Sequence, residues 1–383
     1  MGNVKKIAII DPLGAHEGSF HFYTFGQAKG LINCGNKVSV YTNNKTNKPN
    51  IKQLELFNFY RNIFSSKINV INGIRWIIGS FLSLMHAKIS GCSIFHFHIF
   101  YVNILILFDL ILAKILFGKI VLTIHDVSSF DRGQRFNSLN NIIYKLADLI
   151  LTHNQFSKSE IEKVSDIQDF KIDVIPHGNY IPFISINKDQ SFSRKRLKLP
   201  MYKNILLFFG LIKEVKGLDV LLKAFKDVVV KHPETILLIA GKPWKKDFLS
   251  YQNIIDKYNL KDYCELHIKF IPHEDVAYYY SACDLVVLPY KKIYQSGVLM
   301  MAMSYEKPVL VSNLPPLQEV ITNRKDGFIF ESENIQQLAS IINEILTDLS
   351  MLNSVKDEGN KLIRSKYDWN VIGKMTSESY NKL

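Results

Sequence analysis

Residues 208–225 read FFGLIKEVKGLDVLLKAF, a stretch that predicts the end of a strand, a short loop and the start of a helix. The strand ends at Gly210, Lys213 and Lys216 follow in the loop, and the helix opens after Gly217. Glycine lets a ligand approach the backbone closely, and free amides at a helix N-terminus attract anions. Two lysines beside such a terminus predict a seat for a diphosphate, with a solvated pair of loop lysines as the alternative.

Apolar runs of strand length recur on both sides of this stretch. Further runs in the second half are 204–210, 235–241, 264–270, 285–290, 307–312 and 327–331, and those in the first half are 5–11, 37–42, 93–98, 119–126, 148–153 and 171–178. These runs do not alternate strictly between apolar and polar residues, and segments of helix length separate them. This pattern predicts parallel sheets covered by helices on both faces. The predicted fold class is α/β, with two doubly wound Rossmann-like domains and ligands in an interdomain cleft at the carboxyl ends of the strands.

The domain boundaries follow from composition. Residues 181–203 are polar and basic with a proline near each end, which predicts an exposed linker. The first domain is therefore expected at 1–180 and the second at 204–366. Four dispersed cysteines form no C-x-x-C pair, which argues against disulfides or a zinc site and for a reducing compartment. With no signal-peptide pattern at the start, we expect a cytoplasmic protein.

The net charge of +12 is concentrated in one window. Between Lys37 and Lys119 ten basic residues oppose only Glu55 and Asp109, a net charge of +8. Apolar residues interleave with these charges over 59–89, which suits an anionic membrane surface better than a nucleic acid, whereas a solvated basic surface is the simpler alternative. The apolar segment 101–124 is interrupted by charges and falls short of the ~20 uninterrupted residues that span a bilayer.

Three further segments place polar groups at strand ends. The run 119–126 ends in His125 and Asp126. The histidine could donate a hydrogen bond to a hydroxyl or phosphate, and the aspartate could orient the histidine or act as a base. The alternative is a structural histidine whose ring is hydrogen-bonded to the backbone. His177 lies just before the linker and is expected to line the cleft. His96 and His98 share one face of a strand, but without a third ligand they do not predict a metal site.

Two glycine-containing loops open helices. The first, DPLGAHEGSFHFYTFGQAKGL at 11–31, carries Gly14 and Gly18, followed by Ser19. The second, within 284–321, carries Gln295, Ser296 and Gly297 before a helix that begins at Val298. Free amides at the start of the second helix would bind anionic oxygens without any side-chain charge.

Taken together, these motifs resemble the retaining, GT-B-fold glycosyltransferases of family 4, the glycosyl transferases group 1. The matching elements, in order, are T-I-H-D at 123–126, V-I-P-H-G at 174–178, G-x-x-x-x-x-K-G at 210–217, A-C-D-L-V-V-L-P-Y at 282–290, S-G-V at 296–298 and K-P-V at 307–309. The resemblance implies that the first domain binds the acceptor. It also implies that residues 367–383 form a helix that crosses back onto that domain.

The resemblance further implies the activity and its residues. We expect transfer of a hexose from a nucleotide sugar, with retention, to a glycan or a polyprenyl-diphosphate-linked acceptor in surface polysaccharide assembly. No metal, other cofactor or nucleic acid is expected, since lysines and amides would stabilise the leaving diphosphate. The expected catalytic residues are His125, Asp126 and Lys216, and the expected donor contacts are Gly18, Ser19, His177, Gly210, Lys213, Lys216, Ile271, Gln295, Ser296, Gly297, Val298 and Glu319.

The chain also departs from the family pattern. Leu211 and Ile212 stand where many members have Arg-Leu, so Lys213 is expected to replace the arginine. Ile293 and Met301 stand where two glutamates usually contact the sugar and ribose, whereas Glu319 is retained. The alternative function is therefore a catalytically inactive, glycosyltransferase-like binding or regulatory subunit. A sugar-nucleotide epimerase of the same fold is a further alternative, but it would need more carboxylates near the sugar.

Overall fold

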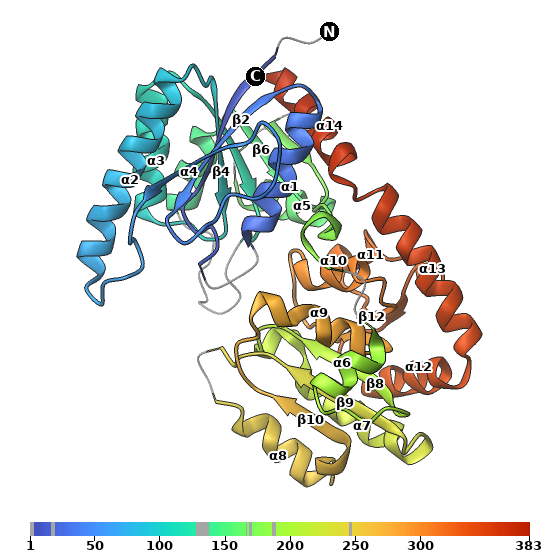
Figure 1. Ribbon diagram of the computed structural model, residues 1–383. Helices are drawn as coiled ribbons and strands as arrows, with labels where there is room; N and C mark the ends of the chain where they lie inside the picture. The colour runs from blue at the N-terminus through green and yellow to red at the C-terminus, as the bar shows by residue number, and fades with distance from the viewer. Residues whose placement is uncertain are drawn as a thin grey trace. The chain divides into compact units, whose positions relative to one another are not determined.

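The computed structural model describes residues 4–16, 20–127, 138–165, 167, 171–185, 189–244 and 247–383. The chain forms two compact units, Met1–Gly178 together with Tyr367–Leu383, and Asn179–Lys366 (Figure 1). Each unit is an α/β structure built on one sheet of parallel strands. The predicted fold class of two doubly wound domains is confirmed, and the predicted cleft between them stays a prediction.

The first unit contains a seven-stranded sheet in the order β3-β2-β1-β4-β5-β6-β7. Its strands are β1 Lys6–Asp11, β2 Lys37–Asn43, β3 Glu55–Tyr60, β4 Ile94–Ile99, β5 Lys119–Ile124, β6 Leu149–Thr152 and β7 Ile172–Val174. The central strands are almost wholly buried because helices cover both faces. The edge strand β3 is missing from the predicted strands: its sequence ELFNFY is only half-buried and carries polar residues.

In the described part of this unit the α-helices are α1 Phe20–Asn33, α2 Asn69–Ile89, α3 Ile104–Ile115, α4 Ser138–Leu146, α5 Gln155–Val164 and α14 Trp369–Ser379. The last of these lies along α1 (Figure 1). A Cβ added at Gly26 would lie 2.0 Å from the ring of Trp369, and one added at Gly373 would lie 2.2 Å from the backbone of Gly30. Glycines on both helices therefore permit this close packing.

The second unit contains a six-stranded sheet in the order β10-β9-β8-β11-β12-β13. Its strands are β8 Asn204–Phe209, β9 Thr235–Ala240, β10 Cys264–His267, β11 Leu285–Leu288, β12 Val309–Ser312 and β13 Phe328–Phe330. Its helices are α6 Gln190–Arg196, α7 Leu218–Lys231, α8 Leu249–Lys257, α9 His273–Ala282, α10 Gly297–Ser304, α11 Pro315–Gln318, α12 Ile335–Thr347 and α13 Leu349–Ser365. The apolar face of α7 and that of α12 meet in its core, through residues such as Phe225 and Ile342.

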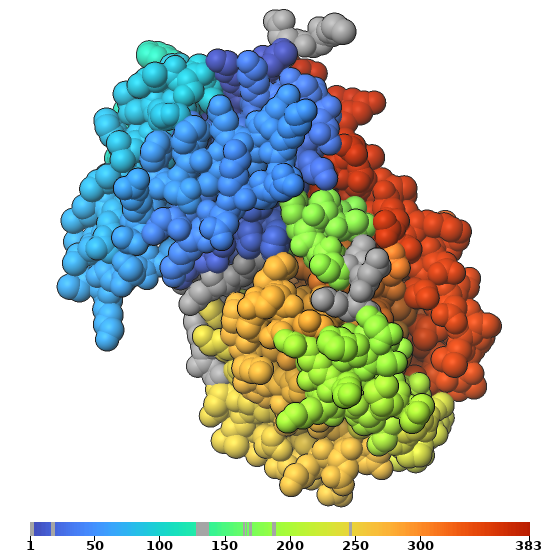
Figure 2. Space-filling model, in the orientation of Figure 1, coloured from blue at the N-terminus to red at the C-terminus, as the bar shows by residue number. Residues whose placement is uncertain are grey.

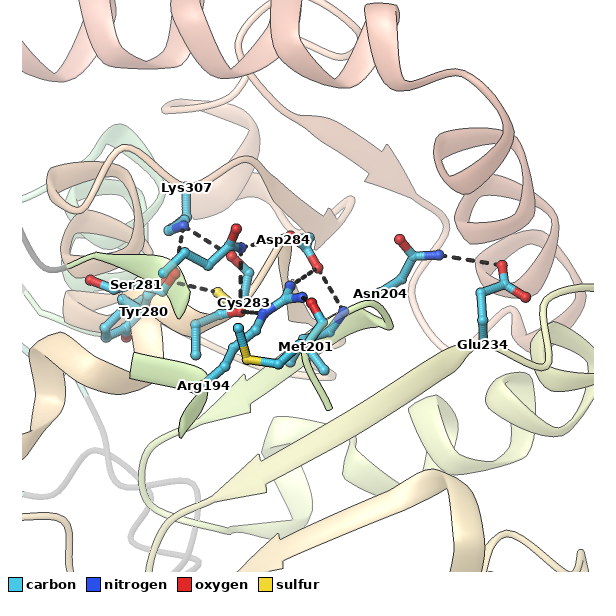
Figure 3. Close-up of polar contacts among 12 residues, drawn as sticks. Arg194, Met201, Asn204, Glu234, Tyr280, Ser281, Cys283, Asp284 and Lys307 are labelled. Atoms are coloured by element: carbon cyan, nitrogen blue, oxygen red, sulfur yellow. Dashed lines mark hydrogen bonds and ion pairs between the residues drawn. The ribbon is translucent and has the colours of Figure 1, made fainter. Parts of the chain in front are cut away.

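Residues 189–203 are part of the second unit and differ from the exposed linker predicted at 181–203. The guanidinium of Arg194 is buried and donates hydrogen bonds to the backbone oxygens of Ala282 and Met201 and to Asp284, at 3.0, 2.7 and 2.8 Å (Figure 3). Asp284 also accepts a hydrogen bond from the amide of Ile205, the second residue of β8. The basic composition that suggested solvent exposure thus includes a buried arginine whose three nitrogen atoms each donate a hydrogen bond.

Both sheets reverse their strand order once. In the first unit the reversal lies between β1 and β4, and in the second it lies between β8 and β11. Loops that leave the carboxyl ends of these strands diverge to opposite faces, which leaves a hollow where ligands bind in doubly wound folds. The candidate site residues are described around these two positions.

Candidate functional site

In the second unit, glycines bring three backbone segments together at the reversal point. Gly210 follows β8 with φ +106°, and a Cβ added to it would lie 3.3 Å from Cγ2 of Val298 at the start of α10. Gly241 follows β9 with φ +154°, and a Cβ there would lie 1.8 Å from the carbonyl oxygen of Gly210. Gly210 and Val298, both predicted donor contacts, therefore lie side by side on a surface that larger side chains would fill.

The loop with the two lysines is fixed to the segment after β11. Gly217 adopts a left-handed conformation, φ +67°, and a Cβ there would lie 1.8 Å from the carbonyl oxygen of Pro289. The amide of Lys291 donates to the carbonyl oxygen of Val215 at 2.8 Å. The ammonium of Lys216 lies 3.7 Å from the ring centroid of Tyr290, a buried side chain. Lys216 is thus held at the reversal point by rigid neighbours.

Lys213 lies at the other end of this short loop. Its ammonium is 4.8 Å from the ring centroid of Trp244, which follows β9. The amide of Trp244 donates to the carbonyl oxygen of Ile212 at 2.9 Å, so the β9 loop and the lysine loop are joined. The position is consistent with a second cation near the same strand ends.

The two nearby helix N-termini differ in charge. The first turn of α7 carries Asp219, whose carboxylate pairs with Lys291 at 2.9 Å. The first turn of α10 has no acidic residue, and its cap is the hydroxyl of Ser296, which accepts from the amide of Leu299 at 3.1 Å. Of the two helix starts that the sequence suggested as anion sites, the terminus of α10, beside Gly210, is therefore the better one.

The loop before α10 contributes one further polar group. Oε1 of Gln295 is buried and has no hydrogen-bond partner among the residues that the structure describes. A buried unpaired amide oxygen is unfavourable until a donor reaches it. Gln295 and the cap residue Ser296 thus place two polar side chains directly before the first residues of α10, Gly297 and Val298.

The remaining predicted contacts of this unit lie further along the sheet. Ile271 follows the edge strand β10, which β9 separates from β8, and its side chain is buried. Glu319 is exposed and follows α11, beyond β12. Met301 is buried inside α10, and Ile293 is half-buried in the preceding loop. The structure brings Gly210 and Val298 together and places Lys216 over Tyr290 in the neighbouring loop, whereas Ile271 follows β10 and Glu319 follows α11.

In the first unit, four histidine rings surround one tyrosine. The ring centroids of His98, His125, His153 and His177 lie 4.9 to 5.2 Å from that of Tyr23 on α1. The histidines come from β4 and from the carboxyl ends of β5, β6 and β7. Register explains part of this arrangement, because Ile124 pairs with Thr152 and the next residues of the two strands are histidines.

His125 and His153 are joined by a hydrogen bond between Nδ1 of His125 and Nε2 of His153, at 3.0 Å. Nδ1 of His153 in turn lies 3.1 Å from the carbonyl oxygen of Ile175. The ring of Phe100 stacks on that of His125, with centroids 4.1 Å apart. Asp126, expected to orient His125, is exposed, and the Nδ1 atom is taken by His153 instead.

Burial keeps these rings neutral. It lowers the pKa of His125 well below its ordinary value, that of His153 to about 3 and that of His177 to about 4. The other histidines of the cluster add to the shift at His125, since a second positive charge nearby is unfavourable. Nδ1 of His177 donates to the carbonyl oxygen of Gly178 at 2.7 Å, which places this predicted donor contact inside the first unit.

The strand pair His96 and His98 is fully engaged in hydrogen bonds. His96 contacts the hydroxyls of Tyr380 and Thr123, and His98 contacts Thr24 and Gln27. Among the described residues, no group of three His, Cys, Asp or Glu side chains is placed to hold a metal ion. The predicted contacts Gly18 and Ser19 lie outside the described residues.

Sequence reasoning missed His153, Tyr23 and Phe100. The signal for His153 was present, because the run DLILTH ends in a histidine on a strand that neighbours β5 in a doubly wound sheet. Tyr23 and Phe100 carried no such signal, since aromatic residues on apolar elements usually fill the core.

Comparison with known proteins relates this geometry to a family. Residues 189–362 match the model of glycosyl transferases group 1. The GDP-mannose:glycolipid 4-beta-D-mannosyltransferase of Xanthomonas campestris pv. campestris is 28% identical over 269 residues, 68% of each chain. The capsular polysaccharide biosynthesis glycosyltransferase CapM of Staphylococcus aureus is 23% identical over 269 residues, 65% of this chain and 68% of that one. The chain spans 49% to 68% of the length of these and other curated relatives.

Among solved structures, Anabaena HepE in complex with UDP and glucose has a TM-score of 0.76 at 18% identity, covering 99% of this chain and 100% of that one. At this identity the likeness concerns the fold. The resemblance seen in the sequence motifs is thus confirmed by the family model and by whole-chain structural similarity. Residues 189–362 thus match the glycosyl transferases group 1 model, and the chain is similar over about two thirds of its length to curated glycosyltransferases and has the GT-B fold of solved ones.

Proposed function

We propose that the protein transfers a hexose from a nucleotide sugar to a glycan or a lipid-linked acceptor during surface polysaccharide or glycolipid assembly, with retention of configuration and without a metal ion. The observation that carries this proposal is the cationic and amide-lined reversal point of the second unit. Lys216, the Gly210 backbone and the N-terminus of α10 converge there. CapM and the Xanthomonas mannosyltransferase act in polysaccharide and glycolipid synthesis, as their names state, which supports the substrate class.

The charges suit a leaving diphosphate. As the bond between the sugar C1 and the diphosphate oxygen breaks, its electron pair moves to that oxygen, and Lys216, Lys213 and the α10 amides stabilise the added charge. The acceptor oxygen bonds to C1 from the same face, and its proton passes to the departing diphosphate oxygen. Fixed cations and helix amides fill the role that a divalent ion has in other transferases, so no metal is needed in this scheme.

The first unit offers a surface for a membrane-linked acceptor, and we propose that the protein acts in the cytoplasm at the inner face of an anionic membrane. Among the described residues, α2 is the one helix long and apolar enough to cross a bilayer. Its inner face is packed, however: Nε1 of Trp76 donates to Asp109 at 3.0 Å, and a Cβ at Gly79 would lie 2.7 Å from Tyr60. A helix packed on its own sheet is suited to lie on a membrane and not to span it.

The outer face of α2 is apolar and has basic flanks. The exposed apolar side chains of the helix are Val70, Ile71, Ile74, Ile77, Ile78, Phe81, Leu82 and Ile89. The helix lies at the left of Figure 1 and forms part of the blue surface at the left of Figure 2. Basic residues precede it and lie in its first turns, including Arg61, Lys67 and Arg75. Each basic residue near an anionic surface contributes ~1 kcal/mol, so the combination supports reversible docking.

A thermal-shift panel of UDP-, GDP-, ADP- and dTDP-sugars tests the proposed function. A ligand at one hundred times its dissociation constant stabilises a protein by about 2.7 kcal/mol, which is easily detected. The stabilising nucleotide sugar is then incubated with the protein alone. Slow release of free sugar supports an active transferase, and binding without any turnover supports the inactive binding subunit. No stabilisation by any of the four would contradict both.

A further inference from the structure

The hydrogen-bond chain that ends at His125 has a fixed direction. A carbonyl oxygen only accepts, so the contact between His153 and Ile175 requires the proton of His153 to be on Nδ1. The ring is neutral because it is buried, so its Nε2 carries a lone pair and accepts the hydrogen bond from Nδ1 of His125. His125, neutral for the same reason, then carries its only proton on Nδ1, which leaves Nε2 bare.

That bare nitrogen is left without a donor in the described part of the chain. Nε2 of His125 is buried and has no hydrogen-bond partner among the described residues, and the ring as a whole is 2% exposed. Phe100 and Tyr23 pack against the ring and hold its plane, at centroid distances of 4.1 and 5.0 Å. A buried acceptor without a donor is unfavourable, so a hydroxyl that reaches it gains a full hydrogen bond.

We propose that His153 is a positioning residue, which holds His125 as the Nδ1-protonated tautomer so that Nε2 of His125 accepts a hydrogen bond from a substrate hydroxyl. The inference rests on the proposed function for the identity of the substrate, a sugar. It reverses the role expected from the sequence, in which His125 donates to a hydroxyl or a phosphate. A lone pair repels a phosphate oxygen and attracts the proton of a hydroxyl, so Nε2 of His125 selects a hydroxyl and not a phosphate oxygen.

The tautomer can be measured without any substrate. Nitrogen-15 chemical shifts and two-bond couplings of labelled histidine distinguish a protonated from a bare ring nitrogen, and a His125→Gln variant assigns the His125 signals. We expect protonated Nδ1 and bare Nε2 on His125 in the unmodified protein at pH 7.5. A protonated Nε2 would overturn the proposal.

Two variants of His153 separate positioning from packing. In His153→Leu the acceptor is gone, so His125 should move its proton to Nε2. In His153→Gln the amide oxygen can occupy the place of the imidazole Nε2 and accept the same hydrogen bond, so His125 should keep its proton on Nδ1. If His153→Leu leaves the tautomer unchanged, His153 does not set it and the proposal fails. If His153→Leu does not fold, the protonation of Nδ1 and Nε2 of His125 is still measured in the unmodified protein and in His153→Gln. A protonated Nε2 in either of them would contradict the proposal.

Kinetics then test the role in transfer. We expect kcat/KM for the nucleotide sugar to fall about 2- to 13-fold in His153→Leu, the range of one net hydrogen bond, with much of the loss restored in His153→Gln. Equal losses in both variants would contradict a positioning role. If the protein transfers no sugar at all, the proposed function is wrong. The tautomer measurements need no substrate, so they still test the role of His153 independently.

Discussion

The ammonium of Lys216 lies 3.7 Å from the ring centroid of Tyr290, and the two residues belong to loops that leave β8 and β11 on either side of the reversal point. This contact holds the charge in the loop after β8, next to the segment that follows β11. Lys216→Ala should weaken nucleotide binding by about tenfold to 150-fold, the range of a charge-assisted hydrogen bond. Isothermal titration with the nucleotide found by the thermal-shift panel measures the loss.

Lys226→Ala is the matched control, because Lys226 also lies over a tyrosine ring, that of Tyr258, at 5.2 Å, but follows two turns along α7. Its replacement should leave the affinity unchanged. Lys213→Ala should weaken binding less than Lys216→Ala, and an unchanged affinity there would contradict the proposal that Lys213 replaces the missing arginine. Unchanged affinity in Lys216→Ala would contradict the site itself.

The second prediction concerns Gly217. A Cβ at this position would lie 1.8 Å from the carbonyl oxygen of Pro289, and the left-handed backbone disfavours any side chain. Gly217→Ala should therefore lower both the unfolding free energy and the nucleotide affinity. Gly35→Ala has a comparable positive φ but nothing within 4 Å, so it isolates the backbone strain of about 1–2 kcal/mol. Equal destabilisation of the two variants in urea would show that the contact with Pro289 can relax.

The third prediction is a loss of stability of the first unit in mild acid. Its buried histidines stay neutral when folded, with the pKa lowered to about 3 for His96 and His153 and to about 4 for His177, but they take up protons near pH 6.5 when unfolded. Unfolding thus binds protons below pH 6.5, so the stability that is complete above this pH decreases as the pH falls toward 4. At pH 5.5 each such ring should cost about 1.4 kcal/mol.

Tryptophan fluorescence can follow this unit alone. Trp76 and Trp369 belong to the first unit and Trp244 to the second, so a Trp244→Phe variant reports on the first. Its urea midpoint should fall clearly between pH 7.5 and 5.5. A midpoint independent of pH would mean that the rings are not held neutral.

The fourth prediction is that transfer persists in excess EDTA. Lys216, Lys213 and the α10 amides are proposed to carry the charge stabilisation, and none of these groups depends on a divalent ion. Initial rates before and after dialysis against the chelator should agree within error. A rate that EDTA abolishes and that manganese or magnesium restores would contradict the proposed chemistry.

The fifth prediction tests the membrane surface. Reversing the charge of Arg61, Lys67 and Arg75 should reduce co-sedimentation with vesicles of anionic lipid by about two orders of magnitude or more, given ~1 kcal/mol for each basic residue removed. Reversal of Lys231, Lys257 and Lys261, three exposed lysines of the second unit, makes the same charge change elsewhere. An unmodified protein that stays in the supernatant at low salt would favour a soluble acceptor.

Much of the fold could be predicted because both sheets consist of buried parallel strands. Such strands read as continuous apolar runs, as in KIVLTI at β5 and TILLIA at β9. The edge strand β3 is half-buried and was missed for that reason. The segment around Arg194 was misread, because composition does not reveal that Asp284, ninety residues later, neutralises the guanidinium.

The site was predicted less evenly. Lys216 and Gly210 could be placed in the loop that joins a strand to a helix, because local sequence shows such a loop. The partner of His125 was not, since hydrogen bonding between neighbouring strands depends on register. Asp126 was chosen because it is adjacent in the chain, whereas His153 is adjacent in the sheet.

The packing of α14 on α1 has a consequence for the order in which the protein is made. Trp369 fills the space left by Gly26 and Gly178, so the first unit lacks part of its core until residues 367–383 are present. During synthesis these residues leave the ribosome only after the whole second unit has been translated. The second unit can therefore finish folding first, whereas in the first unit the face of α1 that packs on α14 stays uncovered until α14 is made. A chaperone that shields exposed apolar surface on nascent chains should then contact α1 for longer than any helix of the second unit.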